Sequence, residues 1–265
     1  MRKRLLNPIT HPLRTASNIV TGIKLSSVEP EEKICKDARQ FWNQEDKSGA
    51  LADHSHWLGV GRWSEKARWF QIGRDHLKMY QTLRLISGSK TPLRHMVEWG
   101  PGGGANALAF GSEVQSFYGV DISMSNLEEC ERQLTAKGFA GFKPVLIPIE
   151  NPSQCLKAIE GPVQFFLSTA VYQHFPSKEY GIEVTRLAHK MLVENGTALV
   201  QIRYDDGRRE YRPKRRDYSR NVVTFTSYNL VEFWQICVQI GFTPLAITLN
   251  PDINYAYFFL QKKPE

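Results

Sequence analysis

Residues 94–126 read RHMVEWGPGGGANALAFGSEVQSFYGVDISMSN. The apolar run Met96–Trp99 predicts a short buried strand that leads directly into glycines, and Ala105–Phe110 then predicts a helix. A second predicted strand, Val114–Val120, ends in Asp121. Glycines at a strand-to-helix turn leave room for a ligand to contact the backbone, and a helix N-terminus offers free N–H groups. An acid at the tip of the next strand can accept hydrogen bonds from ribose hydroxyls. The stretch therefore predicts a site for a nucleotide-type ligand.

The glycine turn itself narrows the kind of ligand. In Gly100-Pro-Gly-Gly-Gly the third glycine comes one position too early for the dinucleotide-binding fingerprint. Glu98 lies directly before the turn, where its carboxylate would repel a pyrophosphate but would suit a cationic amino group. A different nucleotide or a purely structural glycine turn are the alternatives.

Length and composition limit the class of protein. The chain has 265 residues, of which 42% are hydrophobic, enough for one large domain with a small appendage. No apolar run approaches the roughly 18–20 residues that span a bilayer. The four cysteines are widely spaced and form no metal-binding pattern, so we expect reduced thiols in a cytoplasmic protein and no metal site.

The first 28 residues carry five basic side chains and no acid. Prolines and polar residues interrupt the apolar positions, which argues against a signal peptide. We expect a loosely held basic N-terminus, with organellar targeting or peripheral membrane binding as the alternatives.

Two helices are predicted before the first strand, over 29–47 and from Ser64 to Ile86, separated by a loop rich in glycine, histidine and tryptophan. After Pro92 the pattern changes to alternating strands and helices, which is typical of a doubly wound α/β sheet. The predicted strands are 95–99, 114–120, 143–148, 162–168, 197–203, 242–249 and 254–261, and the predicted helices are 104–111, 123–138, 152–159, 177–192 and 226–240.

The sequence resembles the class I S-adenosylmethionine-dependent methyltransferases of the small-molecule type. The resemblance covers about 93–263 and rests on Val97–Gly104, on Tyr118–Ser123 and on the terminal hairpin. It implies a seven-stranded sheet of order 3-2-1-4-5-7-6 with the last strand antiparallel. An N-terminal arm and helical lid would occupy 1–92, and a Rossmann-like methyltransferase domain 93–265.

The resemblance also implies roles for individual residues. Glu98 and the glycine backbone would face the methionine part of S-adenosylmethionine, and Asp121 would hold the ribose hydroxyls. Ile122 and Met124 would border the adenine, with Glu150 near its amino group or simply a solvated turn acid. The predicted cofactor-binding residues are Glu98, Gly100, Pro101, Gly102, Gly104, Asp121, Ile122, Met124, Glu150, Ser168 and Arg62.

The end of the fourth predicted strand bears on the methyl acceptor. Ser168 stands where many members carry Asp or Asn, so the patterns for base amines, ribose 2′-hydroxyls and metal-dependent catechols are not met. The following Tyr172-Gln173-His174 resembles a segment of small-molecule O- and N-methyltransferases. His174 could act as a general base, or it could be a helix-start histidine bonded to backbone.

The loop 53–63 is the second region of interest. Its Arg62 could pair with the methionine carboxylate, and His54 and His56 could line the acceptor site. Alternatively, its tryptophans simply pin the N-terminal helices to the sheet. The predicted catalytic residues are His174, His54, His56 and Tyr172.

Residues 203–220, RYDDGRREYRPKRRDYSR, hold eight basic and four acidic side chains. At the carboxyl edge of the sheet they could bind an anionic small molecule or glycan. Binding of RNA backbone is the alternative for this stretch, although its acids dilute the positive charge. A third hypothesis is a methyltransferase-like binding subunit without turnover.

Overall fold

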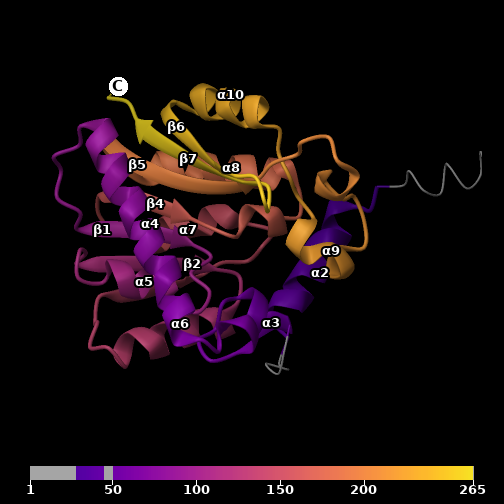
Figure 1. Ribbon diagram of the computed structural model, residues 1–265, viewed down its shortest axis with the longest axis horizontal. Helices are drawn as coiled ribbons and strands as arrows, with labels where there is room; N and C mark the ends of the chain where they lie inside the picture. Colours follow the sequence, from indigo (N-terminus) through magenta and orange to yellow (C-terminus); the bar gives the residue numbers. More distant parts are fainter. Residues whose placement is uncertain (1–27, 45–49, 265) are drawn as a thin grey trace, which may run out of the picture.

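The computed structural model describes residues 28–44 and 50–264 (Figure 1). The basic N-terminal arm and part of the predicted helix 29–47 lie outside the described residues. No helix in the described part of the chain is both long and apolar enough to cross a membrane.

A seven-stranded sheet forms the centre of the molecule, in the order β3-β2-β1-β4-β5-β7-β6. β1 to β5 pair in parallel, and β7 runs antiparallel to both β5 and β6. The strands are β1 His95–Trp99, β2 Ser116–Asp121, β3 Phe142–Leu146, β4 Val163–Ser168, β5 Leu192–Arg203, β6 Phe242–Asn250 and β7 Tyr255–Lys262. The predicted fold class and strand order are confirmed.

Helices cover both faces of this sheet (Figure 1). On one face lie α4 (Lys66–Ser87), α5 (Ala105–Phe110) and α6 (Met124–Thr135), and on the other α7 (Cys155–Ala158), α8 (Lys178–Met191) and α10 (Leu230–Ile240). Strand alternation divides the core between the faces: Met96 packs on the α4 side, and Val97 on the α8 side. Glu98 therefore faces α4 and α5.

Local sequence explains where several of these elements begin and end. α4 ends where Gly88 adopts a left-handed φ of 66°, as the sequence predicted. α10 begins later than the predicted residue 226 because the Asn229 side chain accepts hydrogen bonds from the N–H groups of Val231 and Glu232. The predicted helix 152–159 is divided into η2 (Pro152–Gln154) and α7.

The N-terminal helices lie beside the carboxyl ends of the parallel strands. α2 (Glu31–Trp42) packs its apolar side, which ends in Phe41 and Trp42, near the short helix α9 (Tyr218–Asn221) (Figure 1). α3 (Ala50–His54) and η1 (Gly61–Trp63) follow it. The sequence segments predicted to carry function thus gather on one edge of the molecule.

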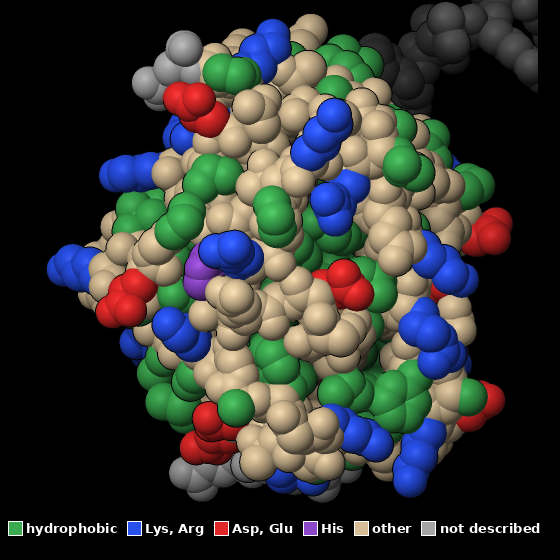
Figure 2. Space-filling model, turned by 90° about the vertical axis from the view of Figure 1, so that its left-hand side faces the viewer, with side chains coloured by type: hydrophobic (Ala, Val, Ile, Leu, Met, Phe, Trp, Pro, Cys, Tyr) green, Lys and Arg blue, Asp and Glu red, His purple; other side chains and the backbone are tan. Residues whose placement is uncertain are grey.

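Figure 2 looks onto the opposite edge, where basic and acidic side chains are interspersed among apolar ones.

Candidate functional site

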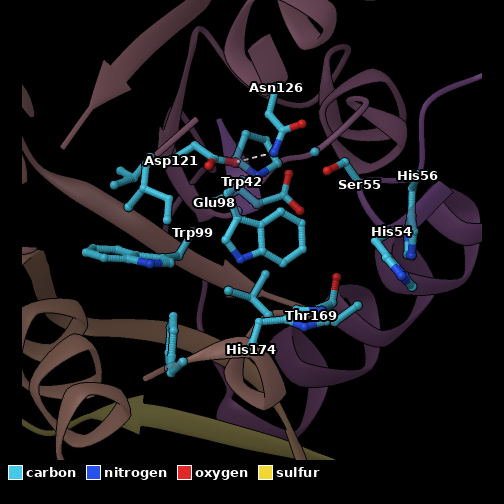
Figure 3. Close-up of a pocket in the computed structure, with 18 of the residues that line it drawn as sticks. Trp42, His54, Ser55, His56, Glu98, Trp99, Asp121, Asn126, Thr169 and His174 are labelled. Carbon is cyan, nitrogen blue, oxygen red and sulfur yellow. Dashed lines mark hydrogen bonds between the residues drawn. The ribbon is translucent and has the colours of Figure 1, made fainter. Parts of the chain in front are cut away.

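A cavity opens at the carboxyl edge of the sheet, where β1, β2 and β4 end (Figure 3). The glycine turn after β1 forms its floor, and Asp121 stands at the end of β2. Trp42 of α2, the α3 end and Tyr218 of α9 complete its wall. The topology therefore brings three distant parts of the chain together around the motif that begins at residue 94.

Glu98 is the buried acid of this cavity. Its side chain lies on β1 and is only 1% exposed. Oε1 accepts a hydrogen bond from Asn106 Nδ2 at 2.5 Å, whereas Oε2 is buried with no hydrogen-bond partner among the described residues. Burial raises the pKa of Glu98 to about 8, and the nearby Asp121 carboxyl raises it further, against the effect of Asn106. A cationic donor at Oε2 would satisfy and ionise this carboxyl.

Asn106, in the first turn of α5, positions the Glu98 carboxyl. Its Nδ2 also lies 3.2 Å from Thr169 Oγ1, and its Oδ1 accepts from His76 Nδ1 at 2.8 Å. Because Asn106 uses both ends of its amide, the orientation of this side chain is fixed. The network holds Glu98 and Thr169 in place on the same side of the cavity.

Asp121 is the second acid. Its Oδ1 accepts from the backbone N–H of Ser123 at 2.9 Å, and its Oδ2 from Asn126 Nδ2 at 3.4 Å (Figure 3). Burial raises the pKa of Asp121 to about 6, although these hydrogen bonds oppose the shift. Ile122 and Ile149 add apolar surface to the same part of the cavity. A carboxyl beside an apolar wall suits a ribose joined to a base.

Gly102 and Gly103 are required by the close approach of protein backbone, in addition to the room for a ligand that the sequence predicts. Gly102 has φ 51°, and a Cβ added to it would lie 2.4 Å from the carbonyl oxygen of Ser55. A Cβ on Gly103 would lie 2.3 Å from the His56 carbonyl, and Gly103 donates its N–H to Ser55 at 2.7 Å. Gly100 also has a positive φ, 75°. The backbone of the loop after α3 therefore lies directly against the glycine turn. Gly100, Pro101 and Gly102 still line the cavity.

His174 lines the cavity from η3 (Tyr172–His174), and its ring meets Trp42 edge-on at 5.0 Å between centroids. Nδ1 lies 2.7 Å from the carbonyl oxygen of Val222, so this nitrogen carries the proton and Nε2 keeps its lone pair. Burial lowers the pKa of His174 to about 4, which leaves the ring neutral at pH 7. The backbone bond expected of a structural histidine is thus present, and Nε2, which lies 3.4 Å from Gln173 Nε2, keeps the lone pair that a base needs.

His54 and His56 also line the cavity. Nδ1 of His54 is buried with no hydrogen-bond partner among the described residues, and burial lowers the pKa of this ring. His56 packs against Trp63 at 4.3 Å between ring centroids, and burial lowers its pKa to about 3. Neither residue belongs to a group of three or more potential metal ligands in 28–44 and 50–264.

Two of the predicted site residues lie in the core. Tyr172 is fully buried, its hydroxyl lies 2.9 Å from Thr185 Oγ1 of α8, and its side chain does not line the cavity. It precedes His174 by two positions on a 3₁₀ turn, which directs the two side chains apart. Ser168 is also fully buried and donates to the carbonyl oxygen of Trp99 at 3.1 Å, joining β4 to β1.

Three further predicted residues lie at the surface and do not line the cavity. Met124 is 46% exposed. Glu150 forms an ion pair with Arg39 of α2 and is thereby directed outward, next to Ile149. The Arg62 guanidinium pairs with Asp53 at 3.1 Å, so it braces the loop 53–63.

Several residues that the fold brings to the cavity carry no signal in the sequence. Asn106 and Thr169 are ordinary polar residues in sequence, but they follow β1 and β4 closely enough to stand at the carboxyl edge. Trp42 lies on the apolar side of α2; its Nε1 donates to Tyr218 Oη at 2.9 Å, and Tyr218 donates to the His174 carbonyl at 2.6 Å. No local pattern signals such a long-range connection.

The basic stretch 203–220 is folded largely onto its own backbone. Arg208 pairs with Asp206, Arg212 donates to the carbonyl of Gly207, and Lys214 donates to the carbonyls of residues 209 and 210. Arg203, at the end of β5, is buried. These side chains do not form one continuous exposed basic surface.

Solved structures of low sequence identity share this architecture. One is BH2331 of Bacillus halodurans C-125, assigned as a methyltransferase; it is 11% identical, and the match covers 69% of this chain and 98% of that one with a TM-score of 0.54. Another is the CcbJ methyltransferase of Streptomyces caelestis, 15% identical over 68% of this chain and 88% of that one, with a TM-score of 0.53. No protein-family model and no curated protein matches the sequence. At these identities the likeness concerns the fold, and together with the strand order it shows that the chain has the fold of the class I S-adenosylmethionine-dependent methyltransferases.

Proposed function

We propose that this protein transfers a methyl group from S-adenosylmethionine to an oxygen or nitrogen of a small or carbohydrate-like, anionic acceptor. The observation that carries the cofactor assignment is Oε2 of Glu98, a buried carboxylate oxygen without a partner at the end of β1. A buried carboxyl in this state is destabilising unless a cation binds it. The α-ammonium group of S-adenosylmethionine is such a cation.

The residues around the cavity fit the rest of this cofactor. Asp121 would accept hydrogen bonds from the ribose hydroxyls, and Ile122 and Ile149 would contact the adenine. When bound, S-adenosylmethionine supplies an electrophilic methyl group on a positively charged sulfur. The task of the chain is to hold the acceptor in line with that methyl group, to exclude water and to take up a proton.

His174 is our candidate for the proton acceptor. Its Nδ1–H is committed to the Val222 carbonyl, which presents Nε2 as a base. Its lowered pKa keeps the ring neutral across physiological pH but makes it a weak base, so alignment contributes more to the rate than proton transfer does. His54, with its unpartnered Nδ1, is the second candidate.

A small acceptor is favoured over RNA because four basic side chains of 203–220 are engaged within their own loop: Arg203, Arg208, Arg212 and Lys214. Filter binding of single-stranded RNA at several salt concentrations tests this choice. Retention with a steep salt dependence that Arg215→Gln abolishes would favour RNA as the acceptor.

Calorimetry of the pure protein with S-adenosylmethionine and S-adenosylhomocysteine tests the cofactor. We expect micromolar binding that Asp121→Ala weakens at least about tenfold, whereas the exposed Asp252→Ala does not change it. The absence of heat with either compound would refute the proposal. Cofactor binding without formation of S-adenosylhomocysteine from a metabolite mixture would instead support the binding-subunit hypothesis.

A further inference from the structure

Arg203 is a buried cation that forms no ion pair in the described part of the chain, although the charges of Glu210 and Asp205 act on it from beyond ion-pair distance. Its side chain ends β5 and is 4% exposed. Nη2 donates to the carbonyl oxygen of Glu210 at 3.1 Å, and the guanidinium lies 4.7 Å from the ring centroid of Tyr211. Nη1 is buried with no hydrogen-bond partner, and no carboxylate in the described part of the chain lies within ion-pair distance of this guanidinium. One carbonyl and one aromatic ring compensate only part of the cost of burying a charge.

Two neighbouring side chains present buried polar atoms that also have no partner among the described residues. Gln201 accepts the Ala170 N–H at 3.0 Å through Oε1, which leaves Nε2 without an acceptor. Gln173 approaches Tyr255 Oη at 3.3 Å with Nε2, which leaves Oε1 without a donor. Both glutamines are 2% exposed. Arg203 Nη1 and Gln201 Nε2 are thus buried donors without an acceptor, and Gln173 Oε1 is a buried acceptor without a donor.

These atoms belong to one place in the fold. Gln201 and Arg203 are two positions apart on β5 and therefore face the same side of the sheet. Tyr255, which contacts Gln173, stands opposite Arg203 in the β5–β7 register. We call Gln173, Gln201, Arg203 and Tyr255 the polar niche.

The polar niche adjoins the cavity on the side of His174. Gln173 Nε2 lies 3.4 Å from His174 Nε2, the nitrogen that faces the acceptor in the proposed function. Ala170, whose N–H binds Gln201, lines the cavity itself. The four niche residues do not line the cavity themselves, so a molecule beyond the transferable methyl would have to extend past Ala170 and His174 to reach the niche.

The charged groups around the polar niche also leave an excess of positive charge. Burial lowers the pKa of Lys214, and the positive charges of Arg203 and Arg209 lower it further, against the acids Glu210 and Asp205. Asp206 is already neutralised by Arg208. The niche therefore favours an anion.

We propose that Arg203 and Gln201 bind a carboxylate group of the methyl acceptor, and that Gln173 accepts a hydrogen bond from a hydroxyl or amino group beside it. This inference rests on the proposed function and names its acceptor class: a small hydroxy or amino carboxylic acid, including an acidic sugar. Two planar donor groups match the two oxygens of a carboxylate. A phosphate would bring a third oxygen and a larger charge, for which no further buried donor stands free in the described niche.

Calorimetry on the full chain saturated with S-adenosylhomocysteine tests the inference, with benzoate, benzamide and phenyl phosphate as probes. We expect the wild-type protein to bind benzoate at least about tenfold more tightly than benzamide. Arg203→Gln should remove that preference, and Arg209→Gln, an exposed arginine of the same stretch, should keep it. Equal affinity for the two probes, or a preference that survives in Arg203→Gln, would overturn the inference. Tighter, Arg203-dependent binding of phenyl phosphate would replace the carboxylate with a phosphate and so also overturn it.

Two control measurements distinguish a lost preference for benzoate from unfolding of the variant and from failure to bind the cofactor. Arg203→Gln should unfold at the same temperature as wild type or higher, because it removes an unpaired buried charge. Arg203→Lys keeps the charge but not the two-pronged geometry, and it should show an intermediate preference for benzoate if the glutamine variant proves unstable. Both variants should bind S-adenosylmethionine as wild type does. If wild type itself fails to bind S-adenosylmethionine, the proposed function fails; if it binds S-adenosylmethionine but does not prefer benzoate, only the carboxylate inference fails.

Discussion

The amide nitrogen of Asn106 lies 2.5 Å from Oε1 of Glu98, and both side chains are buried. One oxygen of the carboxyl is therefore satisfied by the protein, while the other faces the cavity without a partner. This asymmetry makes Glu98 the residue on which the cofactor assignment is most directly tested.

Replacing Glu98 with Gln should weaken binding of S-adenosylmethionine at least about tenfold, because a hydrogen bond between charged groups contributes about 1.5–3 kcal/mol. The same change should leave the ligand-free protein as stable or more stable, because it removes a buried ionisable group. Calorimetry and thermal unfolding measure the two effects. Glu128→Gln, on the exposed side of α6, is the matched control and should change neither quantity. A Glu98→Gln protein that binds the cofactor like wild type would exclude Glu98 as the ammonium ligand.

Between about pH 7 and 8 the ligand-free protein should become less stable as pH rises, because of Glu98. Burial raises the pKa of Glu98 from 4.5 to about 8, so in this window the folded state keeps a proton that the unfolded state has lost, and its removal costs folding free energy. Below about pH 6.5 the lowered pKa values of His56 and His174 act in the opposite sense and offset the contribution of Asp121, whose pKa is raised to about 6. Urea unfolding at several pH values should show a decline between pH 7 and 8 that Glu98→Gln flattens. Wild-type and Glu98→Gln proteins with the same pH dependence in this window would contradict the raised pKa of Glu98.

Cofactor binding should respond to pH in the opposite sense. A cation at Oε2 selects the ionised carboxylate, so affinity for S-adenosylmethionine should increase from pH 6 towards pH 8 and a proton should be released on binding. Calorimetry in buffers of different ionisation enthalpy detects that proton. Binding without proton release at pH 7 would mean that Glu98 is already ionised in the free protein.

The strand order and the positions of the two acids at the carboxyl edge could be predicted because their sequence signals are local. The glycine turn, Glu98 and Asp121 lie at strand ends, where chain direction alone fixes their place at the carboxyl edge. The family resemblance implied an adenine contact for Glu150 and a place in the acceptor segment for Tyr172. In both cases a side chain one or two positions away, Ile149 or His174, faces the cavity instead.

The acceptor side could not be predicted in this way because it depends on contacts between distant segments. Arg203 ends the predicted strand 197–203 and begins the basic stretch 203–220, but no sequence pattern indicates that it is buried. Its lack of an ion pair follows from the packing of β5 against β7, where Tyr255 stands opposite it. Burial and pairing, which decide the chemistry of a charged side chain, are properties of the packed fold.

Gly102→Ala should lower both stability and cofactor affinity, because its Cβ would collide with the Ser55 carbonyl. Gly59→Ala is the matched control: its φ is 88°, but a Cβ there meets nothing within 4 Å. Gly59→Ala should therefore lose only the backbone strain of about 1–2 kcal/mol and keep its affinity for S-adenosylmethionine. Thermal unfolding and calorimetry compare the two. Equal losses would show that backbone strain alone, and not the approach of the loop 53–63, explains the glycine at 102.

Tyr218→Phe and Tyr172→Phe each remove one buried hydroxyl, and they should differ in function. The Tyr218 hydroxyl joins Trp42 to the His174 carbonyl, so its loss leaves two buried groups unpaired, costs about 1–3 kcal/mol and loosens α2 beside the cavity. We expect weaker cofactor binding and faster proteolysis near α2. The Tyr172 hydroxyl contacts only Thr185, which also donates to the Gly181 carbonyl, so Tyr172→Phe should lose some stability but bind S-adenosylmethionine normally. If a folded Tyr172→Phe protein has lost methyl transfer, Tyr172 is a catalytic residue despite its position in the core.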